Sequence, residues 1–398
     1  MGSPEKKLPT VLYIGQNGFP IGLAGIQRQL NLAKAMASIP ARVVVISRKG
    51  VHDRRKPSLA SLPAWGSTEG INFLFASGTP FYPEHFIPRN LLKIKGFVCE
   101  QWYIIYARLF LNARWVLFYS SSYPRLRYYR IFTRLLGQRL ILDYVEFKAG
   151  LENRKLLEPS AQSNFDRLAH RYADGMIIIS SFLRNHVRRL NPSLPIIVIP
   201  PVMDFTKLEI KRPKPPGKPY FLYCGSIQYR DVVDFILTSW RESNCAEKGF
   251  RLILVVNSHK IGQDMASLFG PLDDSVALMS GLLYEELLAY YQGASGLLIP
   301  LMGNLQDNAR FPFKLCEYTA AGRPIITSDS GAILEFFRDG ENALVAKTGD
   351  PLEFAMKMRF VADHPEEAEK IGQAGHQTGL DHFNYASYTG ELKRLIFG

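Results

Sequence analysis

Short apolar runs alternate with helical patterns along most of the chain, and this alternation limits the folds that it can adopt. The runs TVLYIG (10–15) and ARVVVIS (41–47) have the length and composition of buried strands. Between them, GIQRQLNLAKAMASI (25–39) places Ile26, Leu30, Ala33 and Ala37 on one helical face. A strand, a helix and a strand in this order form a βαβ unit, which implies a parallel sheet. The predicted fold class is therefore α/β.

Strand patterns continue on both sides of one interruption. In the first half they are predicted at 72–76, 115–120, 139–144, 175–180 and 195–201, and in the second half at 220–225, 251–256, 276–280, 296–300 and 324–329. Helices of the second half are predicted near 231–242, 284–294 and 312–321. The interruption itself, KRPKPPGKP (211–219), is rich in proline and lysine, which is typical of an exposed linker.

The length of 398 residues exceeds the size at which a single core usually stops growing. We therefore predict two Rossmann-like, doubly wound parallel-sheet domains: an N-terminal domain over 1–205, a linker over 206–219 and a C-terminal domain over 220–380. A C-terminal helix within 381–398 is expected to cross back to the first domain. Ligands of such sheets bind beyond the carboxyl ends of the strands, so the two domains are expected to face each other across a ligand cleft.

Charge is distributed unevenly between the two halves. Residues 1–200 contain 28 Lys and Arg against 11 Asp and Glu, a net charge of +17, whereas the rest contains 20 against 25, a net charge of −5. This asymmetry favours a nucleic acid, a phosphate group or an anionic membrane as a partner of the N-terminal half. No RNA-recognition motif is visible, so no nucleic-acid partner is expected.

Two segments bear on a membrane partner. FVCEQWYIIYARLFLNARWVLFYS (97–120) contains Glu100, Arg108 and Arg114, which excludes a transmembrane helix and leaves a surface or core helix. YPRLRYYRIFTRLLGQR (123–139) combines arginines with Leu, Tyr and Phe. This composition suits an anionic membrane surface, but it is also typical of an ordinary amphipathic helix on a sheet.

The expected location is the cytoplasm. MGSPEKK (1–7) lacks the pattern of a signal peptide, and the four cysteines lie far apart without a CxxC pair, which favours unpaired thiols in a reducing compartment. If the segment 123–139 contacts lipid, the protein is peripheral on the inner face of the membrane.

RFPFKLCEYTAAGRPII (310–326) contains a helix with a basic start. Pro312 is favoured in the first turn of a helix, and Gly322 followed by Pro324 is typical of a helix end. Residues 312–321 are therefore predicted to be helical. Arg310 and Lys314 stand where the helix dipole is already positive, which costs about 0.3–1 kcal/mol per cation. A bound diphosphate would turn both cations into charge-assisted donors beside the free N–H groups of the helix. The alternative is an exposed charged helix, and this segment alone favours neither.

Other loops support an anion site. In YCGSIQYR (223–230), Gly225 permits close backbone approach and Arg230 can reach the same anion. In SDSGAILEFFRDG (328–340), Gly331 permits a tight turn before a predicted helix. GQNGFPIGLAGIQR (15–28) is a glycine-rich strand-to-helix loop, but its spacing is not GxGxxG, so it does not indicate a dinucleotide site.

Together these segments resemble glycosyltransferase family 4. The segments that carry the resemblance are ADGMIIISSFLRNHVRR (173–189), IIVIPPVMD (196–204), FLYCGSIQYRD (221–231), LLYEELLAYYQGASGLLIPL (282–301) and above all RFPFKLCEYTAAGRPIITSDSGAILEFFRDGENALV (310–345). The similarity is dense after residue 173 and sparse between 50 and 170. It implies the GT-B arrangement of two Rossmann-like domains, a nucleotide-sugar donor, and transfer with retention of anomeric configuration.

The family's motifs imply roles for residues of this chain. Glu317 matches the second glutamate of the E-x7-E motif, which holds the donor ribose, whereas Ala309 stands at the first. Val145 stands where the family often has a histidine near the sugar. The catalytic residues predicted from the resemblance are Arg230, Lys314, Asp143 and Glu146. The predicted donor-binding residues are Gly22, Gly225, Arg230, Arg310, Phe313, Lys314, Leu315 and Glu317.

The resulting hypothesis is a retaining, hexosyltransferase-type glycosyltransferase of surface polysaccharide or glycolipid biosynthesis. Its partners would be a nucleoside diphosphate sugar and a glycan or polyprenyl-linked acceptor. Fixed cations and helix N-termini can stabilise the leaving diphosphate, and neither LDDS (272–275) nor the histidines have the spacing of a metal site, so no metal and no cofactor are expected. Two alternatives remain, a nucleotide-sugar epimerase of the same architecture and a non-catalytic basic binding protein.

Overall fold

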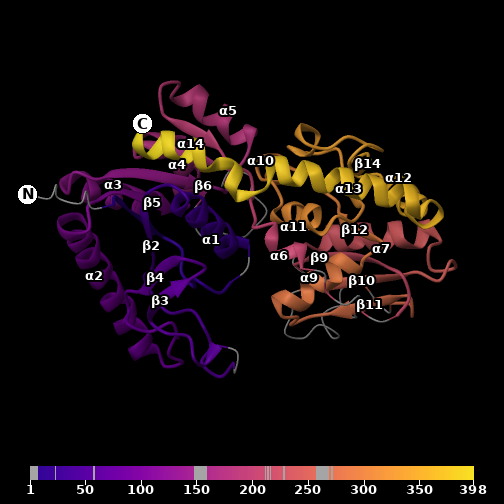
Figure 1. Cartoon of the computed structure of the whole chain (residues 1–398), viewed down its shortest axis with the longest axis horizontal. Coiled ribbons are helices and arrows are strands. Elements are labelled where there is room, and N and C mark those ends of the chain that lie inside the picture. Colours follow the sequence, from indigo (N-terminus) through magenta and orange to yellow (C-terminus); the bar gives the residue numbers. More distant parts are fainter. Residues whose placement is uncertain are drawn as a thin grey trace, which may run out of the picture. The chain divides into compact units, whose positions relative to one another are not determined.

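The chain divides into two compact units. The structure, a computed structural model, describes residues 8–398 apart from 23, 57–58, 148–158, 211, 213–214, 216, 227–228, 257–268 and 270–271. Unit 1 contains residues 1–203 and 385–398, and unit 2 contains residues 204–384 (Figure 1). The segment 1–7 and part of the proline-rich sequence 211–219 lie outside the described residues, while Thr206–Glu209 within the predicted linker forms the short helix α6, in unit 2.

Unit 1 is built on an eight-stranded sheet with the order β3-β4-β2-β1-β5-β6-β7-β8. The strands are β1 Thr10–Ile14, β2 Arg42–Ser47, β3 Trp65–Thr68, β4 Ile71–Phe75, β5 Ala113–Tyr119, β6 Arg139–Tyr144, β7 Gly175–Ile178 and β8 Ile196–Val198. All pair in parallel except β3, which pairs antiparallel with β4. The helices are α1 Ala24–Ala37, α2 Phe86–Phe110, α3 Tyr123–Leu135, α4 Pro159–Leu168, α5 Ser181–Leu190 and α14 Thr389–Phe397.

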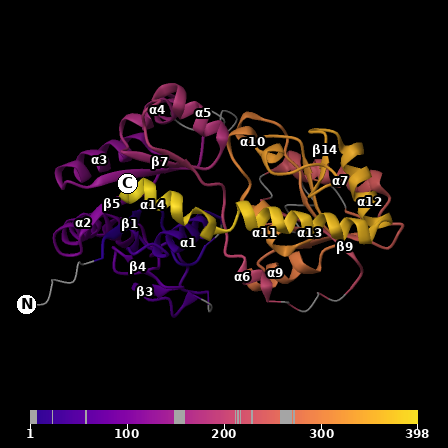
Figure 2. The same cartoon turned by 45° about the horizontal axis from the view of Figure 1, so that its top comes forward.

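Helices cover both faces of this sheet, as the alternation of side chains along its buried strands requires. Val11 and Tyr13 of β1 pack with α1 and α14, whose Leu392 and Ile396 are buried in the same cluster. The two helices lie side by side in Figures 1 and 2. On the opposite face, the ring of Phe118 in β5 lies 4.7 Å from that of Tyr129 in α3. The segment 385–398 therefore completes the core of unit 1.

Unit 2 is built on a six-stranded parallel sheet with the order β11-β10-β9-β12-β13-β14. Its strands are β9 Tyr220–Gly225, β10 Arg251–Val256, β11 Val276–Met279, β12 Gly296–Ile299, β13 Ile325–Ser328 and β14 Leu344–Ala346. Its longer helices are α7 Arg230–Ser243, α9 Tyr284–Gly293, α11 Phe313–Ala321, α12 Pro351–Asp363 and α13 Pro365–His382, and α10 Leu305–Ala309 is short. α7, α12 and α13 share one hydrophobic cluster with the sheet.

Segment 97–120 contains the end of α2 at Phe110 and then β5 from Ala113, with Asn112 between them in the left-handed region (φ 53°), and β5 confirms the strand predicted at 115–120. Two other local predictions were wrong. No helix was predicted between β12 and α11, but this interval contains α10, capped by the Asn304 side chain, which accepts from the Asp307 N–H. The helix expected after Gly331 is only a 3₁₀ turn, Ile333–Glu335.

Two findings concern membranes and thiols. Within the described ranges, no helix combines the length and the apolar character needed to cross a membrane. All four cysteines are unpaired thiols, as predicted, and Cys245 and Cys316 are buried.

Candidate functional site

The strand order of unit 2 reverses between β9 and β12, and the segments that follow these strands carry most of the predicted donor-binding residues. β9 ends at Gly225 and leads to α7, which begins at Arg230, whereas β12 leads to α10 and α11. In doubly wound sheets, ligands bind beyond the carboxyl ends of the strands at such a reversal. The topology thus brings Gly225, Arg310 and Lys314 to one edge of the sheet.

Arg310 lies between α10 and α11 and is held from two sides. Its Nη2 donates to Asp307 Oδ1 at 2.7 Å, and its Nη1 donates to the Tyr229 hydroxyl at 3.0 Å. The guanidinium also lies 5.1 Å from the centre of the Tyr229 ring. Its Nε is buried and has no hydrogen-bond partner in the described part of the chain. An oriented guanidinium with an unused buried donor is suited to receive an anion.

Lys314 lies in the first turn of α11 and forms a salt bridge with Glu317 on the same helix. Lys314 Nζ is 2.7 Å from Glu317 Oε2 and donates to the Tyr291 hydroxyl at 3.0 Å. Burial acts to lower the pKa of Lys314, but attraction by the Glu317 carboxylate outweighs it, and the pKa is raised above the ordinary lysine value. The ammonium group therefore stays charged at the N-terminal end of α11.

Glu317 is almost fully buried, with 1% of its surface exposed. Its Oε2 accepts from Lys314 and, at 3.3 Å, from the Tyr291 hydroxyl. Burial, followed by the Glu317 charge, raises the pKa of Tyr284 above the ordinary tyrosine value. The carboxylate predicted to hold a ribose is thus already a member of an internal network of Lys314 and tyrosine hydroxyls.

The other donor-binding predictions in unit 2 differ in their surroundings. A side chain at Gly225 would overlap the Tyr223 hydroxyl, 2.1 Å from the position of its Cβ, so a larger residue there would require the Tyr223 ring to move. Arg230, at the start of α7, lies with its guanidinium 5.9 Å from the centre of the Phe269 ring. Phe313 is half-buried at the start of α11. Leu315 is fully buried and its N–H donates to the Pro312 carbonyl, a geometry that does not support donor binding.

The predicted residues of unit 1 form a different environment. Asp143 on β6 is buried and accepts from the Arg28 guanidinium at 2.9 Å and from the Tyr13 hydroxyl at 2.6 Å. Arg28 also donates to the carbonyls of Ile199 and Pro200. This ion pair ties β1, α1, β6 and the end of β8 together, which supports a structural role for Asp143 rather than a catalytic one.

Glu146 and Val145 follow β6, Glu146 exposed and Val145 half-buried. Burial, then the charge of Glu146, raises the pKa of the Tyr119 hydroxyl. Gly22 precedes α1, where a Cβ would lie 2.5 Å from Ile26 Cγ1. A larger residue at Gly22 would require Ile26 to move.

The sequence reasoning did not identify Tyr229, Tyr291 and Asp307, which hold the two cations of the site. Asp307 had a signal, because Asn304 and Asp307 form an N-cap pattern at the start of α10. The tyrosines had none, since each belongs to a different segment from the cation that it contacts. In the described part of the chain, no group of three or more His, Cys, Asp or Glu residues could hold a metal ion.

The part of the chain that contains this site is similar to a known protein family. Residues 218–364, which include β9 to α12, match the family described as glycosyl transferases group 1. This agrees with the predicted resemblance to glycosyltransferase family 4. The D-rhamnosyltransferase WbpZ of Pseudomonas aeruginosa is 23% identical over 163 residues, which are 39% of each chain. The chain thus spans less than half the length of the curated relatives it matches.

Solved structures match nearly the whole chain in fold. Sucrose-phosphate synthase from Thermosynechococcus elongatus matches with a TM-score of 0.70 and 16% identity, over 98% of this chain and 99% of that one. Anabaena HepE in complex with UDP-glucose matches with a TM-score of 0.65 and 13% identity, over 97% and 98%. The chain has the GT-B fold, as predicted.

Proposed function

We propose that this protein is a retaining glycosyltransferase that transfers a sugar from a nucleoside diphosphate sugar to a glycan or lipid-linked glycan, in the assembly of a surface polysaccharide or glycolipid. The family match of residues 218–364 and the GT-B fold support glycosyl transfer. The UDP-glucose in the HepE complex supports a nucleotide-sugar donor. WbpZ, named as a rhamnosyltransferase, is consistent with transfer of a single sugar.

The observation that carries the proposal is the pair of cations before and within the first turn of α11. Arg310 retains a buried Nε donor without a partner, and Lys314 remains charged where the helix dipole is positive. Buried donors are nearly always satisfied in folded proteins, so an unused one at a strand-order reversal is best explained by a ligand. A diphosphate matches this arrangement in charge and in acceptor atoms.

The proposed mechanism follows from these charges. When the sugar–phosphate bond breaks, negative charge grows on the departing nucleoside diphosphate, and Arg310 and Lys314 stabilise it because they are already oriented. Asp307, Tyr229 and Tyr291 hold the two cations in position. We also propose that Glu317 binds the ribose of the donor, as the family resemblance implies. Since its Oε2 also accepts from Lys314, ribose and diphosphate binding would be coupled through one carboxylate. The mechanism uses no metal ion.

Nucleotide binding tests the site directly. UDP, GDP or ADP should raise the melting temperature of the protein, because a ligand of the native state stabilises it by mass action. Arg310→Gln should weaken binding by about 1.5–3 kcal/mol, the range for a charge-assisted hydrogen bond. Arg241→Gln, on the exposed end of α7, is the matched control and should bind as the unaltered protein does. Equal affinity of both variants in calorimetry would contradict the assigned site.

Turnover tests the reaction. With a nucleotide sugar and a glycan acceptor, product should form at an unchanged rate after treatment with EDTA. A rate that falls and is restored by Mn²⁺ would contradict the metal-free mechanism. Epimerisation of the donor in the absence of any acceptor would instead identify a nucleotide-sugar epimerase.

A further inference from the structure

The outer side of α2 carries an exposed apolar stripe. Six apolar side chains, each 46–70% exposed, follow one another at intervals of three, four or seven residues, so they lie on one side of the helix. They are Ile87, Leu91, Ile94, Val98, Trp102 and Leu109. The inner side of the same helix buries Gly96, Glu100, Ile104 and Ala107. An ordinary surface helix has a polar outer side. Both sides of α2 are apolar, so the outer one is suited to contact something other than water.

The stripe continues onto α3. Tyr128, Ile131 and Leu135 are 38%, 58% and 81% exposed and lie on one side of that helix. The two helices are neighbours, since the rings of Phe97 and Tyr128 lie 5.5 Å apart and Arg108 Nε donates to the Leu136 carbonyl at 2.8 Å. We call the outer sides of both helices the α2–α3 face.

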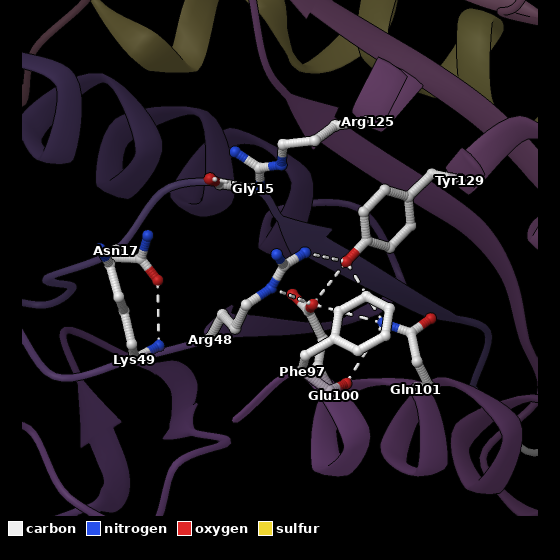
Figure 3. Close-up of polar contacts among 9 residues, drawn as sticks. All are labelled: Gly15, Asn17, Arg48, Lys49, Phe97, Glu100, Gln101, Arg125 and Tyr129. Carbon is white, nitrogen blue, oxygen red and sulfur yellow. Dashed lines mark hydrogen bonds and ion pairs between the residues drawn. The ribbon is translucent and has the colours of Figure 1, made fainter. Parts of the chain in front are cut away.

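The charges of this face have one sign. Glu100 is the single acidic residue of α2, and it is fully buried beneath the helix, while α3 has none. Figure 3 shows Glu100 directed at Arg48, which follows β2, and at Tyr129 of α3, with Arg48 Nε 2.7 Å from Glu100 Oε2. The exposed cations of the two helices are Arg89, Lys93, Lys95, Arg127 and Arg134, and by helical spacing Lys95, Arg127 and Arg134 flank the apolar stripe. An apolar surface with cations and no exposed carboxylate complements anionic lipid headgroups above acyl chains.

The network around Glu100 also fixes the face in place. Arg48 and Gln101 both contact the Tyr129 hydroxyl, so α2, α3 and the end of β2 are joined by one set of polar contacts (Figure 3). The orientation of both helices is therefore set by the fold of unit 1 before any partner binds. Trp102 and Tyr128 are of the types enriched at the water–membrane interface.

We propose that the α2–α3 face docks unit 1 on an anionic lipid bilayer, with α2 lying in the plane of the interface. A second copy of the chain fits less well, because a two-fold contact would place the cations of one face against those of the other. RNA fits less well because the exposed side chains are mainly aliphatic and cannot stack on bases as aromatic ones do. The docking does not depend on the proposed transfer reaction.

Co-sedimentation of the full-length protein with vesicles tests the proposal. The protein should sediment with phosphatidylcholine vesicles that contain phosphatidylglycerol, and weakly or not at all with phosphatidylcholine alone, and added salt should weaken binding. The double variant Ile94→Glu/Trp102→Glu should bind about tenfold more weakly or worse, since two side chains no longer enter the bilayer. Lys95→Glu should weaken binding about fivefold or more.

The matched control replaces exposed apolar residues of unit 2. Leu352→Glu/Met356→Glu changes side chains that are 59% and 61% exposed on α12, and it should bind vesicles as the unaltered protein does. Circular dichroism should be the same for both double variants. Unchanged sedimentation of Ile94→Glu/Trp102→Glu would overturn the proposal. So would equal binding to neutral and anionic vesicles, or a dimer in solution that this variant alone dissociates.

Discussion

Lys314 and Glu317 are joined in an ion pair in which the carboxylate is buried and the lysine is partly exposed, so neither side chain can be removed without affecting the other. A paired buried charge is tolerated, whereas the partner left behind is strongly destabilising. Arg28 and Asp143 form a similar pair in unit 1, where Arg28 also binds two backbone carbonyls. Both pairs bear on how substitutions of predicted catalytic residues are interpreted, because lost activity can reflect lost stability.

We predict that Lys314→Ala lowers the free energy of unfolding by about 3–5 kcal/mol, since Glu317 then stays buried without its cation. Lys314→Ala/Glu317→Gln should regain a large part of this loss, because no uncompensated charge remains. Urea unfolding of the two single variants and the double variant measures the coupling. If the single Lys314→Ala protein is as stable as the unaltered one, the pair does not hold the first turn of α11.

At the scale of single residues, the sequence indicated the cations of the site but not the tyrosines that hold them. Arg310 and Lys314 were identified because two cations at a helix start are unfavourable without an anion. Asp143 was assigned a catalytic role from the family resemblance, and its partner Arg28, more than a hundred residues earlier, gives no local sign of pairing with it. Tyr229 and Tyr291 were missed for the same reason.

At the scale of elements, buried parallel strands were the most predictable features. β6, β9 and β10 have the predicted bounds, and α11 begins one residue later than predicted and ends at Ala321 as predicted, because Gly322 in the left-handed region (φ 68°) terminates it. β3 and β14 were missed, since both are short and lie at sheet edges. The strand that follows α2 was predicted at 115–120 and is β5, but the end of α2 at Phe110 was not predicted.

Replacing a glycine within a helix by alanine usually stabilises a protein, but at Gly372 of α13 we expect the opposite because of a contact with the end of α11. A Cβ at Gly372 would lie 2.7 Å from the Arg323 carbonyl carbon and from the Pro324 nitrogen, which are backbone atoms. Gly372→Ala should therefore destabilise unit 2 by about 1–3 kcal/mol, more than the roughly 1 kcal/mol that alanine contributes in a helix.

Gly390→Ala in α14 is the control for this substitution, because nothing lies within 4 Å of the added methyl group. Its stability should be unchanged or slightly increased. Thermal unfolding compares the two variants. A melting temperature of Gly372→Ala at or above that of Gly390→Ala would show that the α11–α13 contact can widen at little cost.

At the scale of the whole molecule, the chain passes from unit 1 into unit 2 once and returns once. The returning segment is part of the unit 1 core, because Leu392 and Ile396 are buried with α1 and the sheet, and the Phe397 ring lies 4.7 Å from that of Trp115. A helix within 381–398 was expected to cross back to the first domain, and residues 385–398 do belong to unit 1.

We expect Leu392→Ala to lower the stability of unit 1 by about 2–5 kcal/mol, the range for removing a buried leucine side chain. Lys393→Ala, at the adjacent exposed position, should change stability by about 0.5 kcal/mol or less. Denaturant unfolding followed by tryptophan fluorescence measures both. Similar curves for the two variants would show that α14 is not required for the unit 1 core.

The return of residues 385–398 to unit 1 has a consequence for biosynthesis. A ribosome makes the eight strands of the first sheet early, but it makes Leu392 and Ile396 only after all of unit 2. Unit 1 of the nascent chain therefore lacks α14 while unit 2 is synthesised, and the part of its core that Leu392 and Ile396 cover stays exposed to solvent.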